Sequence, residues 1–210
     1  MNRKALLIGA GGHAKVILDI LNGQGITIEA IISPKVDMSF SLFKNVKHFK
    51  NDDDVLRYNT DEVVLVNGVG SLPGDQTRAS IFDYFCKLGY EFLTVKSHNA
   101  RVSEFCEIGM GVQIMPGVII NASTTIGNNT IINTGAIIDH DCSIGSYNHI
   151  APGAVLSGGV VTGNYTHVST GAKVIQGIKI GEHALVGVGA ALSKDLGSGK
   201  KLYVAKPFET

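Results

Sequence analysis

Aliphatic residues recur at every sixth position through the second half of the chain, from Val102 to Leu192. Every position in this series is aliphatic except Thr162, which follows Val161. A period of six fits neither a helix nor a simple two-sided strand. It is typical of a solenoid whose triangular coil has one short strand on each side and an aliphatic residue pointing to the axis. The pattern therefore predicts a parallel β-helix over residues 97–196, with a continuous aliphatic column inside.

Glycine supports the same interpretation, because the chain has 26 glycines and many fall in rhythm in this half. The residue directly after the aliphatic one is often glycine, as at Gly109, Gly127, Gly145 and Gly163. We expect these residues to adopt the left-handed backbone at the corners of each coil. The alternative, an irregular sandwich rich in valine and isoleucine, does not explain an unbroken phase. The tail, residues 197–210, is expected to cover the last coil.

The first part of the chain, residues 1–96, has a different pattern. It reads as a strand, a glycine turn and an amphipathic helix over residues 4–25, followed by strands in 26–33 and 62–70. A second helix is expected over 77–89 and a closing strand over 90–95. Strands that alternate with helices predict a small Rossmann-like parallel sheet, whose ligands bind at the carboxyl ends of the strands. The loops at that edge are residues 9–15, 33–37 and 67–74.

The glycine turn GAGGHA at residues 9–14 matches the dinucleotide pattern GxGxxA, so an NAD(P) site is one interpretation. However, the second strand ends at Ser33-Pro34 and not at the acidic residue that would bind a ribose. A phosphate-binding turn for a diphosphate-linked sugar therefore fits better than a dinucleotide site. The remaining alternative is that these glycines only make a tight turn.

Composition and charge narrow the function further. The chain is 44% hydrophobic and 17% charged, as expected of a globular protein. Its 18 basic and 18 acidic residues give no reason to expect nucleic acid or an anionic membrane as a partner. The three cysteines form no CxxC pair, and the sequence shows neither a signal peptide nor a membrane span. We therefore expect a cytoplasmic protein with reduced thiols.

Three features together resemble a known family: the turn GAGGHAKV, the segment NTGAIIDHDCSIGSYNHIAPGAVLSG and the uninterrupted hexapeptides. The chain is similar over its whole length to bacterial nucleotide-sugar N-acetyltransferases of the sialic-acid O-acetyltransferase-like group. That group includes enzymes that acetylate UDP-4-amino-4,6-dideoxy sugars for surface glycans. The resemblance implies a left-handed β-helix, a homotrimer, acetyl-CoA bound between neighbouring β-helices, and a nucleotide-linked amino sugar on the N-terminal domain. O-acetylation of sialic acid or a related sugar is the alternative activity.

The resemblance also assigns residues. His140 matches the catalytic histidine, Asp141 the acidic residue after it, and His149 a second histidine of the motif, which we expect to bind the substrate. The substrate-binding set that we expect in the N-terminal domain is Gly11, Gly12, His13, Lys15, Ser33, Asn67 and Gly68. Asp141 stands where some members have glutamate, and Ser33-Pro34-Lys35 replaces an acidic pair of some UDP-sugar members. The nucleotide base therefore stays open.

The chemistry of acetyl transfer agrees with this assignment. A histidine has a pKa near the working pH and can accept the proton of an amine, and an adjacent carboxylate can orient the imidazole. Neither serine nor cysteine lies in a nucleophile motif, so we expect direct attack by the amine on the thioester. Backbone N–H groups near Gly153 or Gly158 are candidates for the oxyanion site.

The residues expected to bind acetyl-CoA rest on weaker signals. Small residues allow backbone contact with pantetheine, and lysines can bind its phosphates; the expected set is Gly153, Ala154, His167, Gly171, Ala172 and Lys206. His149 and His167 are 18 residues apart (167 − 149), so we expect them to stack on one side of the coil.

Two other functional classes remain at this stage. Stacked histidines suggest a zinc hydratase of the γ-carbonic-anhydrase type, but His183 is 16 residues after His167 (183 − 167) and supplies no third ligand in phase. We therefore expect no metal. A non-catalytic scaffold is the third class.

Overall fold

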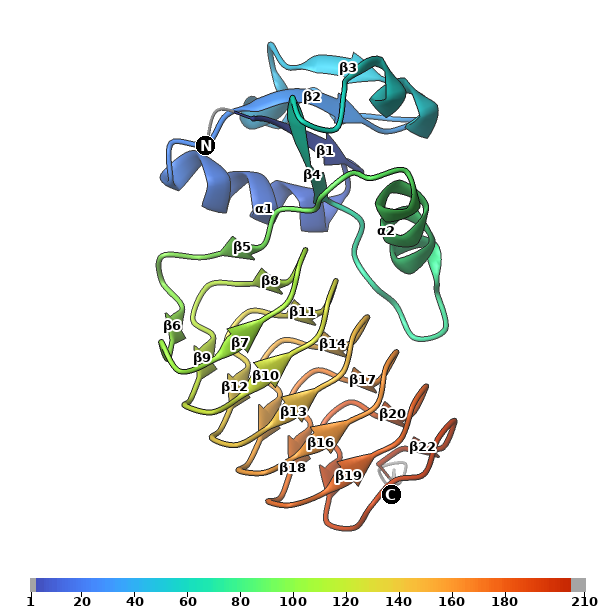
Figure 1. Ribbon diagram of the computed structural model, residues 1–210. Helices are drawn as coiled ribbons and strands as arrows, with labels where there is room; N and C mark the ends of the chain where they lie inside the picture. Colours follow the sequence, from blue (N-terminus) through green and yellow to red (C-terminus); the bar gives the residue numbers. More distant parts are fainter. Residues whose placement is uncertain (1–2, 205–210) are drawn as a thin grey trace, which may run out of the picture. The chain divides into compact units, whose positions relative to one another are not determined.

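The computed structural model describes residues 3–204, and its two compact units divide between residues 98 and 99 (Figure 1). No helix among these described residues is long and apolar enough to cross a membrane.

The first unit contains a parallel sheet with the strand order β3-β2-β1-β4. Its strands are β1 (Lys4–Ile8), β2 (Ile28–Ile32), β3 (Lys47–Phe49) and β4 (Val63–Asn67). The helices are α1 (Gly12–Gly23) and α2 (Thr77–Lys87), with 3-10 turns η1 (Ser41–Phe43) and η2 (Asp52–Arg57). Ile8 is in register with Ile32 of β2 and Asn67 of β4, so the carboxyl ends of these strands lie at one edge. The Rossmann-like prediction is confirmed.

The fourth strand of this sheet differs from the sequence prediction. It is the edge strand β3, whose three residues are too few to show a period. Residues 90–95 were expected to form that strand, but they make only an isolated bridge from Phe92 to Leu65, followed by the short β5 (Val95–Lys96). The prediction was wrong here because apolar content alone does not distinguish a paired strand from a buried extended segment.

The second unit is a triangular β-helix whose short strands stack into three parallel sheets (Figure 1). We call the sheets faces 1, 2 and 3. Face 1 consists of β7 (Glu107–Ile108), β10 (Thr125–Ile126), β13 (Ser143–Ile144), β16 (Val161–Thr162) and β19 (Lys179–Ile180). Face 2 has β8 (Gln113–Ile114), β11 (Ile131–Ile132), β14 (His149–Ile150), β17 (His167–Val168), β20 (Leu185–Val186) and β22 (Lys201–Leu202). Face 3 has β6 (Arg101–Val102), β9 (Ile119–Ile120), β12 (Ile137–Ile138), β15 (Val155–Leu156), β18 (Lys173–Val174) and β21 (Ala191–Leu192).

From Ile114 to Leu192 the members of the series are buried inside the β-helix, and they pair with residues one coil away, as Ile126 does with Ile144. This register confirms the hexapeptide prediction and makes the interior a continuous apolar column. The expected role of the glycines directly after the aliphatic residues was wrong. The left-handed backbone falls three positions after the aliphatic residue, for example at Gly135 (φ 67°) and Asp141 (φ 57°).

Those glycines have a different reason to be glycine. A Cβ on Gly127 would lie 2.5 Å from the backbone nitrogen of Ser146, and one on Gly145 would lie 2.5 Å from the carbonyl oxygen of Gly163. The chain at this position touches the backbone of the next coil, so no side chain fits.

Thr162 replaces an aliphatic residue in the column, and it is only 5% exposed. Its Oγ1 accepts hydrogen bonds from Nδ2 of Asn148 (2.6 Å) and from the backbone nitrogen of Gly145 (3.0 Å). The hydroxyl therefore satisfies two buried donors that an aliphatic side chain would leave without an acceptor.

We predict that Thr162→Val lowers the free energy of unfolding by about 1–3 kcal/mol, because the two donors lose their acceptor while the shape is kept. Thr162→Ser keeps the hydroxyl and is the matched control, expected to cost less. Chemical denaturation measures both. A valine variant as stable as the wild type would show that these hydrogen bonds contribute nothing.

Candidate functional site

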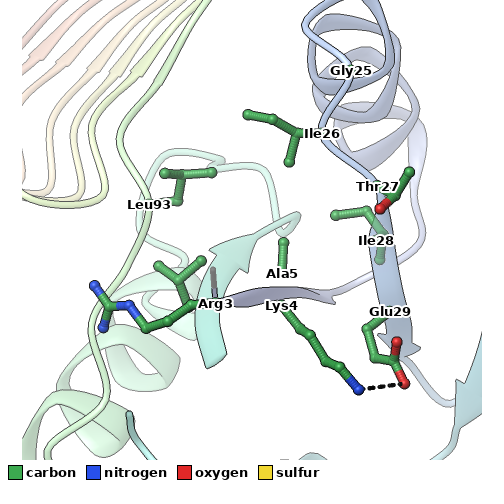
Figure 2. Close-up of a pocket in the computed structure, with 10 residues that line it drawn as sticks. Arg3, Lys4, Ala5, Gly25, Ile26, Thr27, Ile28, Glu29 and Leu93 are labelled. Atoms are coloured by element: carbon green, nitrogen blue, oxygen red, sulfur yellow. Dashed lines mark ion pairs between the residues drawn. The ribbon is translucent and has the colours of Figure 1, made fainter. Parts of the chain in front are cut away.

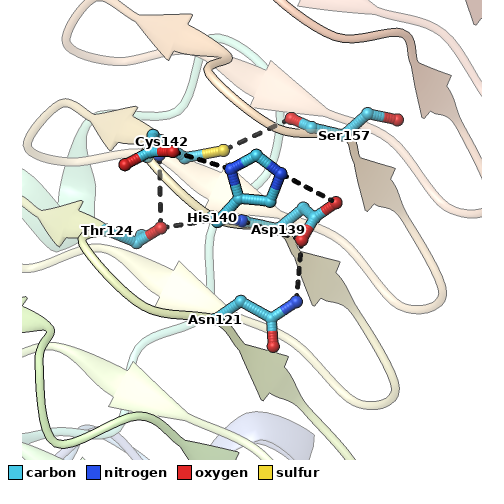
Figure 3. A network of polar contacts seen from close by, with 7 residues as sticks. Asn121, Thr124, Asp139, His140, Cys142 and Ser157 are labelled. Atoms are coloured by element: carbon cyan, nitrogen blue, oxygen red, sulfur yellow. Dashed lines mark hydrogen bonds and ion pairs between the residues drawn. The ribbon is translucent and has the colours of Figure 1, made fainter.

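His140 lies in the corner between β12 of face 3 and β13 of face 1 (Figure 3). Its Nδ1 is 2.7 Å from Oδ2 of Asp141, whose left-handed backbone turns the carboxylate back onto the ring. The charged acceptor fixes the tautomer with the proton on Nδ1, so Nε2 carries the free lone pair. The His140 side chain is 61% exposed, so the ring can be reached by a substrate.

The turn that carries His140 is held from inside the coil. The Thr124 hydroxyl donates to the carbonyl oxygen of Asp139 at 2.8 Å, and the backbone nitrogen of Cys142 donates to the same hydroxyl at 3.3 Å (Figure 3). Cys142 is buried, and burial raises the pKa of its thiol. A buried neutral thiol is a poor nucleophile, in agreement with the expectation of direct attack.

Asp139 is the second carboxylate of this corner, and the sequence analysis did not assign it. Its Oδ1 accepts hydrogen bonds from Nδ2 of Asn121 (2.7 Å) and from the backbone nitrogen of His140 (2.8 Å), and these bonds lower the pKa of Asp139. Its Oδ2 lies 4.0 Å from Nε2 of His140. The hydrogen bond to Asp141 and the charge of Asp139 together raise the pKa of His140. The sequence did contain a signal for Asp139, because an acidic residue lies on each side of His140.

Gly158 lies one coil beyond His140 and supports the imidazole. A Cβ at Gly158 would lie 2.6 Å from Cε1 and 2.7 Å from Nε2 of His140, so only glycine allows this position of the ring. Gly153, the other glycine considered for the oxyanion, lies in the corner between faces 2 and 3 instead. Of the two, only Gly158 is next to the histidine.

A cleft of about 450 Å³ opens beside His140, over the coils that precede it. Asp139, His140 and Asn121 contribute to its wall, together with Phe105, which is 72% exposed. The other lining residues are Arg101, Val102, Ser103, Glu104, Ile120 and Ala122. The cleft gives an acceptor molecule a place beside His140.

His149 and His167 are partners in the pairing of β14 with β17, so their expected position above one another on one side of the coil is confirmed; their rings meet edge to face, with centroids 4.8 Å apart. Nδ2 of Asn133 is 3.0 Å from Nε2 of His149. Burial lowers the pKa of His167 to about 4, so its imidazole is neutral near pH 7. Residues 3–204 contain no group of three histidine, cysteine or acidic side chains placed to bind a metal.

The residues expected to bind acetyl-CoA do not share one place in the single chain. Gly153 and Gly171 lie in the corner between faces 2 and 3, and His167 lies on face 2. Ala154 and Ala172 are fully buried inside the coil, and their backbone groups already bond within the β-helix. The structure therefore does not present these two alanines to a ligand, a correction that follows from the inward direction of their repeat position. Lys206 lies outside the described residues.

In the first unit, the turns after β1 and β4 pack closely together. A Cβ at Gly68 would lie 2.9 Å from the carbonyl oxygens of Ile8 and Gly9, and Gly70 lies beside His13. Gly11 and Gly12 face open space at the first turn of α1, where no side chain caps the helix. Free backbone N–H groups at a helix N-terminus bind phosphate, so this geometry suits a diphosphate.

The other expected substrate residues shape this edge. Lys15 Nζ pairs with Oδ2 of Asp37 at 2.9 Å, and this hydrogen bond and those from Ser39 lower the pKa of Asp37 to about 2. The Ser33 hydroxyl donates to the carbonyl oxygen of Lys35, and Nδ2 of Asn67 donates to that of Arg78. Ser33 and Asn67 are almost fully buried, so their side chains hold loops.

Arg78 on α2 was missed by the sequence analysis because a single arginine in a helix gives no signal. Its guanidinium is buried and donates to the carbonyl oxygens of Asn67 (3.0 Å) and Val69 (2.7 Å). Burial lowers the pKa of Arg78 to about 9, so it still carries a positive charge near pH 7. This cation fixes the loop after β4.

A larger cavity, of about 530 Å³, lies at the amino ends of β1 and β2 (Figure 2). Ala5, Ile26, Ile28 and Leu93 give it an apolar lining, and Lys4 pairs with Glu29 at its rim. Ligands of parallel sheets bind at the carboxyl ends, which is the opposite edge, so this cavity is not the predicted sugar site.

Two family models match the sequence. The bacterial transferase hexapeptide model, with six repeats, matches residues 105–140 and 123–158, and the PglD N-terminal domain model matches residues 4–85. No curated protein matches the chain.

Solved structures are similar over almost the whole length. A variant of perosamine N-acetyltransferase from Caulobacter crescentus, in complex with CoA and GDP-perosamine, is 32% identical with a TM-score of 0.83, over 94% of this chain and 92% of that one. The acetyltransferase domain of PglB from Neisseria gonorrhoeae FA1090, in complex with acetyl coenzyme A, is 26% identical with a TM-score of 0.86, over 96% of both chains. WeeI from Acinetobacter baumannii AYE, at 24% identity and a TM-score of 0.82 over 95% of both chains, shares the fold.

The left-handed β-helix, the small parallel sheet before it and these relatives agree, and the chain belongs to the family of hexapeptide-repeat sugar N-acetyltransferases with a PglD-type N-terminal domain.

Proposed function

We propose that this chain transfers the acetyl group of acetyl-CoA to the 4-amino group of a nucleotide-linked amino-dideoxy sugar, with His140 as general base. The observation that carries the proposal is the His140–Asp141 pair, in which a carboxylate holds Nδ1 of an exposed histidine that lines a cleft. A base needs a free lone pair within reach of the proton that it removes. The bound CoA and acetyl-CoA of the similar structures support the donor.

In the proposed reaction the amine nitrogen attacks the thioester carbonyl carbon, and the electron pair of the C=O bond moves to oxygen. Nε2 of His140 takes a proton from the nitrogen, and Asp141 stabilises the imidazolium that forms. The C–S bond then breaks, and the proton passes from the imidazolium to the leaving thiolate. The backbone N–H of Gly158, beside the ring, is the candidate donor to the oxyanion.

The phosphate-binding turn at Gly11 and Gly12 is proposed to hold the diphosphate of the sugar nucleotide. The proposed nucleotide is UDP or GDP. UDP follows from the sequence resemblance, and GDP is supported by the described complex of perosamine N-acetyltransferase with GDP-perosamine. The open space at both glycines suits either, because phosphate recognition by backbone N–H groups does not depend on the base.

Thiol release from acetyl-CoA tests the reaction. We expect turnover with at least one of the UDP-, GDP- and dTDP-linked 4-amino sugars, and a decrease of about 10²- to 10⁴-fold in His140→Ala, because the base is lost. Gly158→Ala, whose Cβ would displace the imidazole, is expected to lower the same rate. His183→Ala removes an imidazole from a different corner and is the control.

Release of thiol with CMP-sialic acid or free sialic acid, and with none of the amino sugars, would reassign the chain to O-acetylation. If none of these acceptors gives thiol release, both activities are contradicted and the scaffold class remains.

The pH dependence tests the role of Asp141. A general base works only when neutral, so kcat/KM falls as the pH drops through the pKa of His140, which lies above its usual 6.5. Asp141→Asn removes the charged acceptor, lowers that pKa and should move the acid limb of the profile to lower pH. An unchanged acid limb would show that Asp141 does not act on His140.

We also propose that the chain works as a homotrimer, as the resemblance implies. Support comes from the separation of the expected site residues: His140 lies at the corner between faces 3 and 1, Gly153 at the corner between faces 2 and 3, and His167 on face 2. A single ligand could contact all three only if a second copy of the chain contributed some of them. Sedimentation equilibrium should give three times the mass of the chain. A stable single-chain mass in the active protein would contradict the trimer.

A further inference from the structure

Two residues that line the cleft, Asp139 and His140, bring two hydrogen-bond acceptors close together. They are Nε2 of His140, whose partner nitrogen is held by Asp141, and Oδ2 of Asp139, and they lie 4.0 Å apart (Figure 3). Two acceptors at this distance do not bond to each other. A single donor atom about 2.9 Å from each would bridge them, with an angle of roughly 90° at that atom.

A primary amine fits this gap, because it carries two N–H bonds and one lone pair. One hydrogen would point to Nε2, the other to Oδ2 of Asp139, and the lone pair would be left for the thioester carbon. A hydroxyl has only one hydrogen. It can bond to one acceptor and must turn an oxygen lone pair toward the other.

We propose that Asp139 is a specificity-determining residue, which accepts the second N–H of the sugar amine and thereby selects an amino acceptor over a hydroxyl. The inference rests on the proposed function and deepens it, because it assigns amine selection to a residue other than the base. Sites that hydrogen-bond a substrate group discriminate strongly against analogues that leave an acceptor without its partner.

The surroundings of Asp139 suit this role. Its Oδ1 is occupied by the bonds from Asn121 and from the backbone nitrogen of His140, so the orientation of the carboxylate is fixed and Oδ2 is the oxygen nearer to Nε2 of His140. The same bonds lower the pKa of Asp139 and keep it charged near pH 7. As the N–C bond forms, the nitrogen becomes positive, and a fixed carboxylate against its second hydrogen stabilises that charge until Nε2 removes the first.

The test compares Asp139→Asn with the wild type on two acceptors that share one nucleotide, a 4-amino sugar and its 4-hydroxy counterpart. The asparagine oxygen can keep the bonds from Asn121 and His140, which places an NH₂ donor where Oδ2 was. We expect kcat/KM for the amino sugar to fall about tenfold to hundredfold, while the hydroxy sugar is unchanged or improved. Glu107→Gln, which removes an equal charge from exposed face 1, is the matched control and should change neither rate more than threefold.

A folded Asp139→Asn protein whose ratio of amino to hydroxy kcat/KM stays within threefold of the wild type would overturn the inference. The proposed function would still stand in that case, because wild-type turnover of the amino sugar tests it separately. Asp139→Ser provides a second variant if the asparagine protein does not fold. Its hydroxyl can keep the turn hydrogen bond, it removes the acceptor at Oδ2, and the same fall in the ratio is expected.

Discussion

Each coil of the β-helix is in register with the coils before and after it, and the rest of the second unit depends on this pairing. Ile126 pairs with Ile144, and the same relation runs along all three faces. The pairing satisfies the backbone and stacks the aliphatic residues into one column. It also explains the glycines after the aliphatic positions, such as Gly127 and Gly145, since any side chain there would meet the backbone of the next coil.

The same register builds the candidate site. Because the corners stack as well, Asn121 lies one coil before Asp139 and donates to its carboxylate, while Gly158 lies one coil after His140 and leaves room for the imidazole. The aliphatic side chains inside the β-helix have no polar group that could take part in this chemistry. The corner can therefore carry a left-handed Asp141 and an exposed histidine, because pairing on either side holds the turn in place.

In the first unit, the candidate substrate site depends on the carboxyl edge of the parallel sheet. Its parallel strands end together, so the glycine turn after β1 and the loop after β4 meet, and a buried arginine, Arg78, holds that loop by its carbonyl oxygens. The helix N-terminus at Gly11 and Gly12 is left uncapped by side chains, and the proposed phosphate binding rests on this feature.

The sequence by itself determined the β-helix, the α/β unit and the glycine turn, and it made His140 the candidate base, because period, alternation and the motif around His140 are local or strictly repeated signals. The tertiary structure alone decided what depends on distant packing. It placed the edge strand β3, and it showed that the glycines after the aliphatic residues lie against the backbone of the next coil. It also paired Thr162 with Asn148 and buried Ala154 and Ala172 inside the coil. It also set the 4.0 Å between Asp139 and His140, which adjacency in sequence does not fix, because side-chain direction at a corner depends on the coils above and below.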